Sequence, residues 1–231
     1  MNKTNYISKM PPSGSFGLTP MMEQYIKIKE SHLDEILFYR MGDFYEMFFN
    51  DAKVASSVLD ITLTKRGQWN DHDIPMCGIP FHSADNYLIK LINNGFRIAI
   101  CEQIKSNNIS INKIRGPMER NVVRIITPGT ILEETHFNDN TNNFLCSWNE
   151  VGGHQSISWV DLSTGIFFTE KLNNKIPSSL ETTLERISPR ELIMPLYMKE
   201  RKPYFYKGCI SFQADSLFQS EICEKRLKDF Y

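Results

Sequence analysis

Apolar and polar positions along the first half of the chain predict strands and helices in alternation. Thr19-Pro20 suits an N-cap followed by proline in the first helical turn, and the apolar spacing after it predicts a helix over residues 20–31. The run EILFYRM before Gly42-Asp43 predicts a buried strand, and RIAIC predicts another. Two more helices are expected over DAKVASSVL, capped by Asn50 or Asp51, and over NYLIKLINN, starting near Ser83 and ending at Gly95. This alternation predicts a mixed α/β domain.

The pattern changes after the segment TPGT, which ends at Thr130. NNFLCSW and QSISWVDLSTGIFFTEKL read as antiparallel strands, with turns at Gly152-Gly153 and Ser163-Thr164-Gly165. A helix over LETTLERI, capped by Ser178-Ser179 and ended by Pro189, precedes the strand ELIM. The domain boundaries that follow are a flexible tail over residues 1–17, a first domain over 18–128 and a second over 129–231.

The segment MGDFYEMFF places Glu46 among aromatic and methionine side chains, where burying an unpaired carboxylate is costly. One interpretation is an amphipathic helix from residue 44, with Phe44, Met47 and Phe48 in the core and Glu46 in solvent; the spacing alone favours it. The other is an extended segment, in which Phe44 and Glu46 share one face. Only the extended segment lets these two side chains act on the same object.

Composition narrows the class of protein without naming a function. The 231 residues are 41% hydrophobic and 23% charged, which suits two globular domains with real cores. The polar N-terminus has no signal-like apolar region and no apolar run is long enough to cross a membrane, so a cytoplasmic protein without a membrane partner is expected. The five cysteines form no C-x-x-C pair, so they are expected to be reduced and mostly buried.

The net charge of −1 gives no global sign of a nucleic-acid partner. Residues 1–128 carry 15 lysines and arginines against 13 acids, and the remainder carries 11 against 14. If the chain binds DNA, the local placement of charges has to achieve it.

Four long segments follow one another over residues 18–130: LTPMMEQYIKIKE, ILFYRMGDFYEMFFNDAKVASSVLDITLTKRG, IPMCGIPFHSADNYLIKLINNGFRIAICEQI and GPMERNVVRIITPGT. In this order they closely resemble the mismatch-recognition domain of the bacterial DNA mismatch-repair family MutS. The resemblance implies a mixed-sheet α/β domain that binds mispaired or unpaired bases in double-stranded DNA. Residues 129–231 resemble, more loosely, the family's connector domain, which has a ribonuclease-H-like α/β arrangement.

The resemblance assigns the family's F-x-E element to Phe44-Tyr45-Glu46. It implies that Phe44 enters the minor groove, stacks on a mispaired base and helps to kink the duplex, while Glu46 hydrogen-bonds that base. An apolar wedge has to unstack a base step, and a mispaired step costs least to open. A carboxylate near phosphates is repelled unless it meets a base donor or takes up a proton, so Glu46 would add discrimination.

Weaker candidates for contact with the DNA backbone or groove follow from the same resemblance: Lys65, Arg66, Met76, Gly78, Pro80 and His82. Lys65-Arg66-Gly67 is expected to form a basic turn after the strand-like ITLT, either contacting phosphate or lying in a solvated loop. Residues 76–82 are expected to form a loop beside the wedge, with Gly78 allowing a tight turn or a close approach. Cys77 and His82 alone are too few ligands for a metal site, so no metal is expected.

The remaining expectations concern partners and enzymatic activity. No G-x-x-x-x-G-K-[ST] motif occurs, so the ATP, the magnesium and the ATPase activity that the resemblance implies for the full-length family are not expected here. The implied partners are mismatched DNA, the rest of a MutS protein with a second subunit, and a MutL-type protein at a connector that is expected to be incomplete. A nuclease using Asp161, expected in mid-strand, is one rival; two-metal hydrolysis needs further acids that the sequence does not show. A protein-interaction module without DNA discrimination is another.

Overall fold

The computed structural model describes residues 10–104, 117–130, 143–173 and 175–230. Contacts divide the chain into two units, Met1–Thr127 and Pro128–Tyr231, and each is described by itself. None of the helices in these described ranges is long and apolar enough to cross a membrane.

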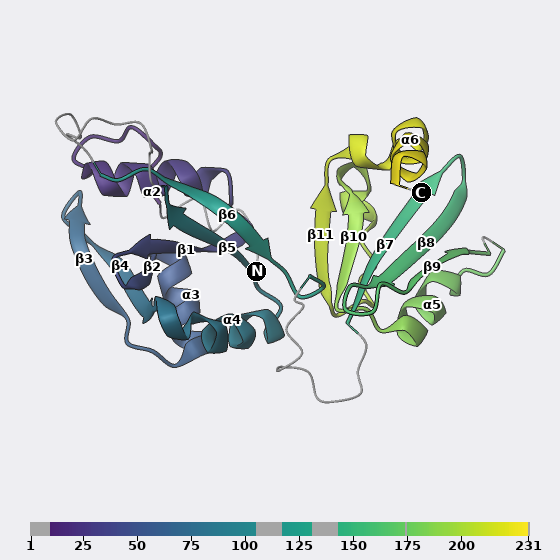
Figure 1. Cartoon of the computed structure of the whole chain (residues 1–231), viewed down its shortest axis with the longest axis horizontal. Coiled ribbons are helices and arrows are strands. Elements are labelled where there is room, and N and C mark those ends of the chain that lie inside the picture. The colour runs from purple at the N-terminus through teal and green to yellow at the C-terminus, as the bar shows by residue number, and fades with distance from the viewer. Residues whose placement is uncertain (1–9, 105–116, 131–142, 174, 231) are drawn as a thin grey trace. The chain divides into compact units, whose positions relative to one another are not determined.

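The first unit is built on one mixed, six-stranded sheet (Figure 1). Its strands lie in the order β3-β4-β2-β1-β5-β6, and among these pairings the one between β1 and β5 is parallel while the others are antiparallel. The strands are β1 (Glu35–Met41), β2 (Phe44–Phe48), β3 (Thr64–Trp69), β4 (His72–Pro80), β5 (Arg97–Gln103) and β6 (Arg120–Ile126). This confirms the predicted mixed α/β fold.

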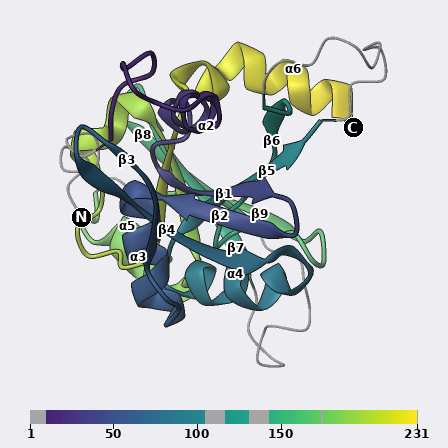
Figure 2. The same ribbon diagram turned by 90° about the vertical axis from the view of Figure 1, so that its left-hand side faces the viewer.

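Helices cover both faces of this sheet. Figures 1 and 2 show α2 (Pro20–Glu30) on one side and α3 (Phe49–Leu59) with α4 (Ala84–Asn93) on the other. Under α2, Tyr25 and Ile26 pack with Tyr39 and Phe48 in a fully buried core. Helices therefore cover both faces of the sheet near its centre. A functional surface on the sheet has to lie where the helices leave it uncovered.

The ends of the helices follow the sequence in part. Thr19 caps α2 as predicted, because its hydroxyl accepts a hydrogen bond from the amide of Met22. The caps predicted for α3 are wrong: the helix starts at Phe49, and Asp51 is buried in its first turn. Ser83 lies at the N-cap of α4, but its side chain makes no capping bond there.

The buried carboxylate of Asp51 joins three elements of the first unit. It lies 2.8 Å from the Lys29 ammonium of α2 and accepts the amide of Leu37 in β1 at 2.9 Å. Lys29 also donates to the carbonyl of Glu35, and both charged side chains are almost completely excluded from solvent. A tertiary contact, and not the helix cap, therefore explains why an acid stands here.

The second unit contains a five-stranded sheet in the order β11-β10-β7-β8-β9. The first three strands along the chain form an antiparallel meander, and the last two add in parallel beside β7. This is the ribonuclease-H-like arrangement that the family resemblance of residues 129–231 implies. Its elements are β7 (Phe144–Val151), β8 (His154–Asp161), β9 (Phe167–Lys171), α5 (Ser179–Ile187), β10 (Glu191–Pro195), β11 (Cys209–Gln213) and α6 (Ser220–Phe230).

The turns predicted for the meander are present, but Asp161 is not in mid-strand. It is the last residue of β8, and its carboxylate accepts hydrogen bonds from the Ser163 amide at 2.9 Å and hydroxyl at 2.6 Å. These bonds, led by the one from the hydroxyl, lower the pKa of Asp161. The carboxylate thus holds the turn over Ser163-Thr164-Gly165.

A buried glutamate joins the start of the second unit to its sheet. Glu191 accepts the amide of Gly129 at 3.0 Å and the Ser211 hydroxyl at 2.5 Å. A Cβ atom at Gly129 would lie 2.6 Å from a Leu145 methyl and 2.8 Å from the Glu191 Cβ. This position therefore requires glycine because there is no room for a side chain.

Candidate nucleic-acid interface on the first sheet

The segment 44–48 is a strand, which decides between the two interpretations of the sequence. In β2, Phe44 and Glu46 point to the same face, while Tyr45 and Met47 point to the other. Phe44 is 47% exposed, whereas Met47 and Phe48 are fully buried. The helical core stripe that the spacing favoured is therefore wrong, and an exposed phenylalanine lies beside a glutamate.

Packing on the opposite face explains why β2 holds its position. Tyr45 and Met47 are paired in register with Ile79 and Cys77 of β4, and all four are buried. The Tyr45 hydroxyl donates a hydrogen bond to the Glu102 carboxylate. Burial raises the pKa of Tyr45 to about 12. Tyr45 is thus a packing residue, and Phe44 is left at the open end of the strand next to the β1–β2 turn.

Glu46 is not a free carboxylate in this structure. One terminal nitrogen of Arg66 lies 2.5 Å from both of its oxygens. Burial raises the pKa of Glu46, and the charges of Arg66 and Arg120 partly offset this effect. The sequence placed these residues in one candidate set but did not predict their ion pair.

Arg66 reaches Glu46 from an irregular strand. The predicted basic turn at Lys65-Arg66-Gly67 is wrong, because these residues lie within β3, and of the preceding ITLT only Thr64 is in the strand. Lys65 pairs with Pro75 and Gln68 with Asp73, so Arg66 and Gly67 together lie opposite one residue of β4. This two-against-one arrangement is a β-bulge, and Gly67 within it has a positive φ of +73°, which glycine adopts at little steric cost.

The hairpin turn lies further along the chain, at Asn70-Asp71. Both residues have positive φ, 48° and 60°, as a two-residue turn with the right twist demands. Asn and Asp tolerate this conformation better than other non-glycine residues. The dipeptide was the signal in the sequence that could have located the turn.

Residues 76–80 are also strand and not the expected loop. Met76, Gly78 and Pro80 of β4 are paired with Phe48, Glu46 and Phe44 respectively, so they share the face of the two candidate readers. Met76 packs against the core below α2, while Gly78 and Pro80 are half-buried. The structure thus brings Gly78 and Pro80 beside Phe44 and Glu46.

Gly78 leaves space at this face. Its φ is not positive, so it makes no tight turn. A Cβ atom there would be 3.7 Å from the Glu46 Cγ and 4.0 Å from a Phe44 ring carbon, which is ordinary contact. A longer side chain would cover Phe44 and Glu46, so glycine leaves both side chains uncovered on this side.

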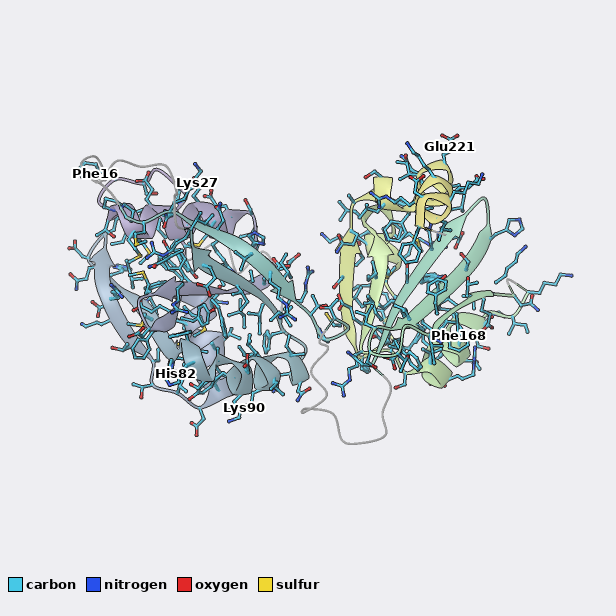
Figure 3. All side chains as sticks on the ribbon, viewed as in Figure 1. Phe16, Lys27, His82, Lys90, Phe168 and Glu221 are labelled. Carbon is cyan, nitrogen blue, oxygen red and sulfur yellow. The ribbon has the colours of Figure 1, made fainter. Side chains whose placement is uncertain are left out.

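The other candidates lie apart from this pair. Lys65 is exposed and pairs with Asp73 at 2.8 Å. His82 lies in the 3-10 turn η1 (Phe81–Ser83) that leads into α4, and it is exposed (Figure 3). Cys77 is buried and donates to a carbonyl of α3, so the structure does not bring it together with His82. Within the described ranges, no group of three or more His, Cys, Asp or Glu residues could hold a metal ion.

Arg120 is a neighbour of the site that sequence reasoning missed. This buried residue of β6 donates to the carbonyls of Arg40 and Met118 and lies over the ring of Tyr39 at 4.9 Å. Its charge acts on Glu46, but its hydrogen bonds go elsewhere. No local sequence pattern links these two positions.

Comparison with known proteins assigns both units to one family. Residues 19–135 match the family model of MutS domain I, and residues 143–231 match that of MutS domain II. The chain is 42% identical over 219 residues to the DNA mismatch repair protein MutS of Wolbachia pipientis wMel. The aligned region covers 92% of this chain and 25% of that protein. The chain thus spans about a quarter of its relative's length. The chain belongs to the MutS family.

Proposed function

We propose that the first unit recognises mispaired or unpaired bases in double-stranded DNA, using Phe44 as a wedge and Glu46 as a hydrogen-bonding reader. The observation that carries this proposal is the half-exposed Phe44 ring beside Glu46 on one face of β2, in a chain of the MutS family. The wedge lies at the start of a strand whose other face is buried. It is therefore presented from a firmly packed element, as a residue that has to push bases apart requires.

Selectivity of the wedge follows from the cost of opening the duplex. A base stacked on an aromatic ring gains about 1–3 kcal/mol whatever its identity. Unstacking a step costs about a few kcal/mol, and it costs least where the bases are already mispaired. Phe44 thus selects deformable steps and reads no sequence.

Glu46 adds a second criterion based on its charge. A carboxylate close to the phosphate backbone is unfavourable unless a donor compensates it. The Watson–Crick edge of a paired base is occupied, whereas a mispaired base can offer a donor. Glu46 would therefore weaken binding to paired DNA more than binding to mismatched DNA.

The wider role belongs to a longer assembly. We propose that the second unit, the connector, serves contacts with a MutL-type partner, and that the remaining parts of a MutS protein and a second subunit supply ATP-dependent steps. Lys65, Arg66 and His82 would add contacts to the phosphate backbone, and Met76, Gly78 and Pro80 would line the groove beside Phe44. The contacts of Lys65 and His82 with phosphate would position the duplex without reading its pairing.

The proposal is tested by the affinity of this chain for two duplexes that differ only in one unpaired base. Binding is measured at one low salt concentration, because phosphate contacts strengthen there and affinities at different salt cannot be compared. We expect tighter binding to the duplex with the unpaired base. Equal affinities would favour the alternative of a protein-interaction module.

Variants of Glu46 test its role as a reader. Gln keeps the shape of the side chain and removes the charge, so we expect it to tighten binding to paired DNA more than to mismatched DNA. Ala removes the contact with the base as well, so affinity for mismatched DNA should fall. The readout is the ratio of the two affinities at fixed salt. A ratio unchanged in both variants, with lower thermal stability, would assign Glu46 a structural role only.

A further inference from the structure

Both oxygens of Glu46 are engaged by a single nitrogen of Arg66 at 2.5 Å. The Glu46 side chain is 13% exposed, and that of Arg66 is 41% exposed. The carboxylate is thus largely covered while its partner faces solvent. A base that is to hydrogen-bond Glu46 meets a carboxylate that is already occupied.

The ion pair joins strands that are not neighbours. Arg66 lies on β3 and Glu46 on β2, and β4 runs between them in the sheet. The bulge at Arg66-Gly67 alters the direction of the β3 side chains, and the opposite position Gly78 carries no side chain beside Glu46. Bulge and glycine together favour this long-range contact.

Two positive groups face Glu46, Arg66 from β3 and Arg120 from β6. Arg120 is buried and directs its donors to the carbonyls of Arg40 and Met118 and to Gln24. Within the described part of the chain, Arg66 is the residue that forms an ion pair with Glu46. It is also the more exposed of the two arginines, so it is the one that a phosphate can reach.

We propose that Arg66 is a specificity-determining residue that exchanges partners: it holds Glu46 in the free protein and moves to a phosphate when a mispaired base takes the carboxylate. The inference rests on the proposed function of Glu46 as a reader. A paired base has no free donor to displace the guanidinium, so Arg66 stays bound to Glu46. The phosphate contact of Arg66 then forms only with a mismatch. When a mispaired base binds Glu46, the complex therefore gains two contacts that paired DNA lacks, one between the base and Glu46 and one between Arg66 and phosphate.

The exchange makes a prediction that simple repulsion by Glu46 does not. Glu46→Gln weakens the hold on Arg66, so Arg66 can contact phosphate on any duplex. We expect several-fold tighter binding to paired DNA and a logarithmic salt dependence steeper by about 0.9, the effect of one added phosphate contact. In an Arg66→Gln background the same substitution should produce a clearly smaller change in both quantities, because no arginine remains to be released and only the repulsion by the Glu46 charge is relieved.

The measurement is a double-mutant cycle on paired DNA with the wild-type chain, both single variants and the double variant. It is made in mildly alkaline buffer, so that Glu46 is charged wherever it is present. Lys65→Gln is the matched control background: it removes one positive charge from the same strand but leaves the ion pair intact. The gain from Glu46→Gln should persist there.

Three outcomes are decisive. A gain from Glu46→Gln that is as large without Arg66 as with it overturns the exchange and leaves simple repulsion as the role of Glu46. The exchange is also overturned if the gain from Glu46→Gln disappears in the Lys65→Gln background. The gain would then depend on the total positive charge and not on Arg66. Failure of the wild-type chain to prefer the unpaired base refutes the proposed function itself, whatever the cycle on paired DNA shows. Thermal melting of each variant confirms that folded proteins are compared.

Discussion

Replacing Phe44 with alanine is expected to abolish the preference for mismatched over paired DNA while leaving the folded state nearly unchanged. The ring is 47% exposed and lies outside the buried core below α2, so the free energy of unfolding should change by no more than about 0.5 kcal/mol. Losing a stacking contact of about 1–3 kcal/mol lowers the affinity for mismatched DNA by a factor of about 5 to 160. Affinity for paired DNA should change far less.

The matched control for this variant is Phe16→Ala. Phe16 is 98% exposed and lies on the segment before α2, away from β2 in sequence (Figure 3). Both substitutions remove one solvent-facing phenylalanine, so a difference between them isolates the position. If Phe44→Ala lowered the melting temperature strongly and the preference survived, the ring would be a packing element and the wedge would be refuted.

Replacing Asp51 with alanine is expected to destabilise the first unit by about 3–5 kcal/mol, because it removes one partner of the buried ion pair with Lys29. The amide of Leu37 loses its acceptor at the same time. A loss of this size is a large fraction of the total stability of a domain. Chemical denaturation of the whole chain, followed by a signal from the first unit, measures it.

Asp85→Ala is the control for Asp51→Ala. Asp85 is an exposed acid in the first turn of α4, so its loss should cost no more than about 1 kcal/mol. Asp51→Asn, which retains an acceptor for the Leu37 amide but not the charge, should fall between the two. Equal costs for Asp51→Ala and Asp85→Ala would mean that the buried pair contributes no more than a surface acid.

Elements with local signals could be predicted from the sequence. Thr19-Pro20 marks the start of α2, and EILFYRM coincides with β1. Capping chemistry and short apolar runs act over a few residues, so the chain reports them directly. The mixed α/β class followed from such elements, and the family resemblance gave the arrangement of both units.

The segment 44–48 could be interpreted from the sequence as either a strand or a helix, and this ambiguity has a physical reason. Phe48 is buried in the core below α2, while Met47 points to the other face and is buried as well. A strand covered on both faces loses the alternation of apolar and polar residues that identifies strands. The apolar spacing that remains also fits a helix, and only the tertiary structure decides.

Two further errors arose because one residue type serves several purposes. Gly67 was expected in a turn, but it supplies the positive φ of a bulge, while Asn70-Asp71 makes the turn. Asp51 was expected to cap a helix, but it is held by Lys29. The Glu46–Arg66 pair left no local trace either, since it joins two strands that a third separates.

The strand order of the second unit has a consequence for how it folds. β7, β8 and β9 follow one another along the chain and pair with their immediate neighbours, so this meander closes only short loops. β10 instead pairs with β7, from which the rest of the meander and α5 separate it along the chain. Closing this longer loop has a larger entropic cost. During synthesis the meander leaves the ribosome first, with the edge of β7 open until β10 arrives. An unpaired edge of this kind can associate with other chains, so the pairing of β10 with β7 closes one route to aggregation of the nascent unit.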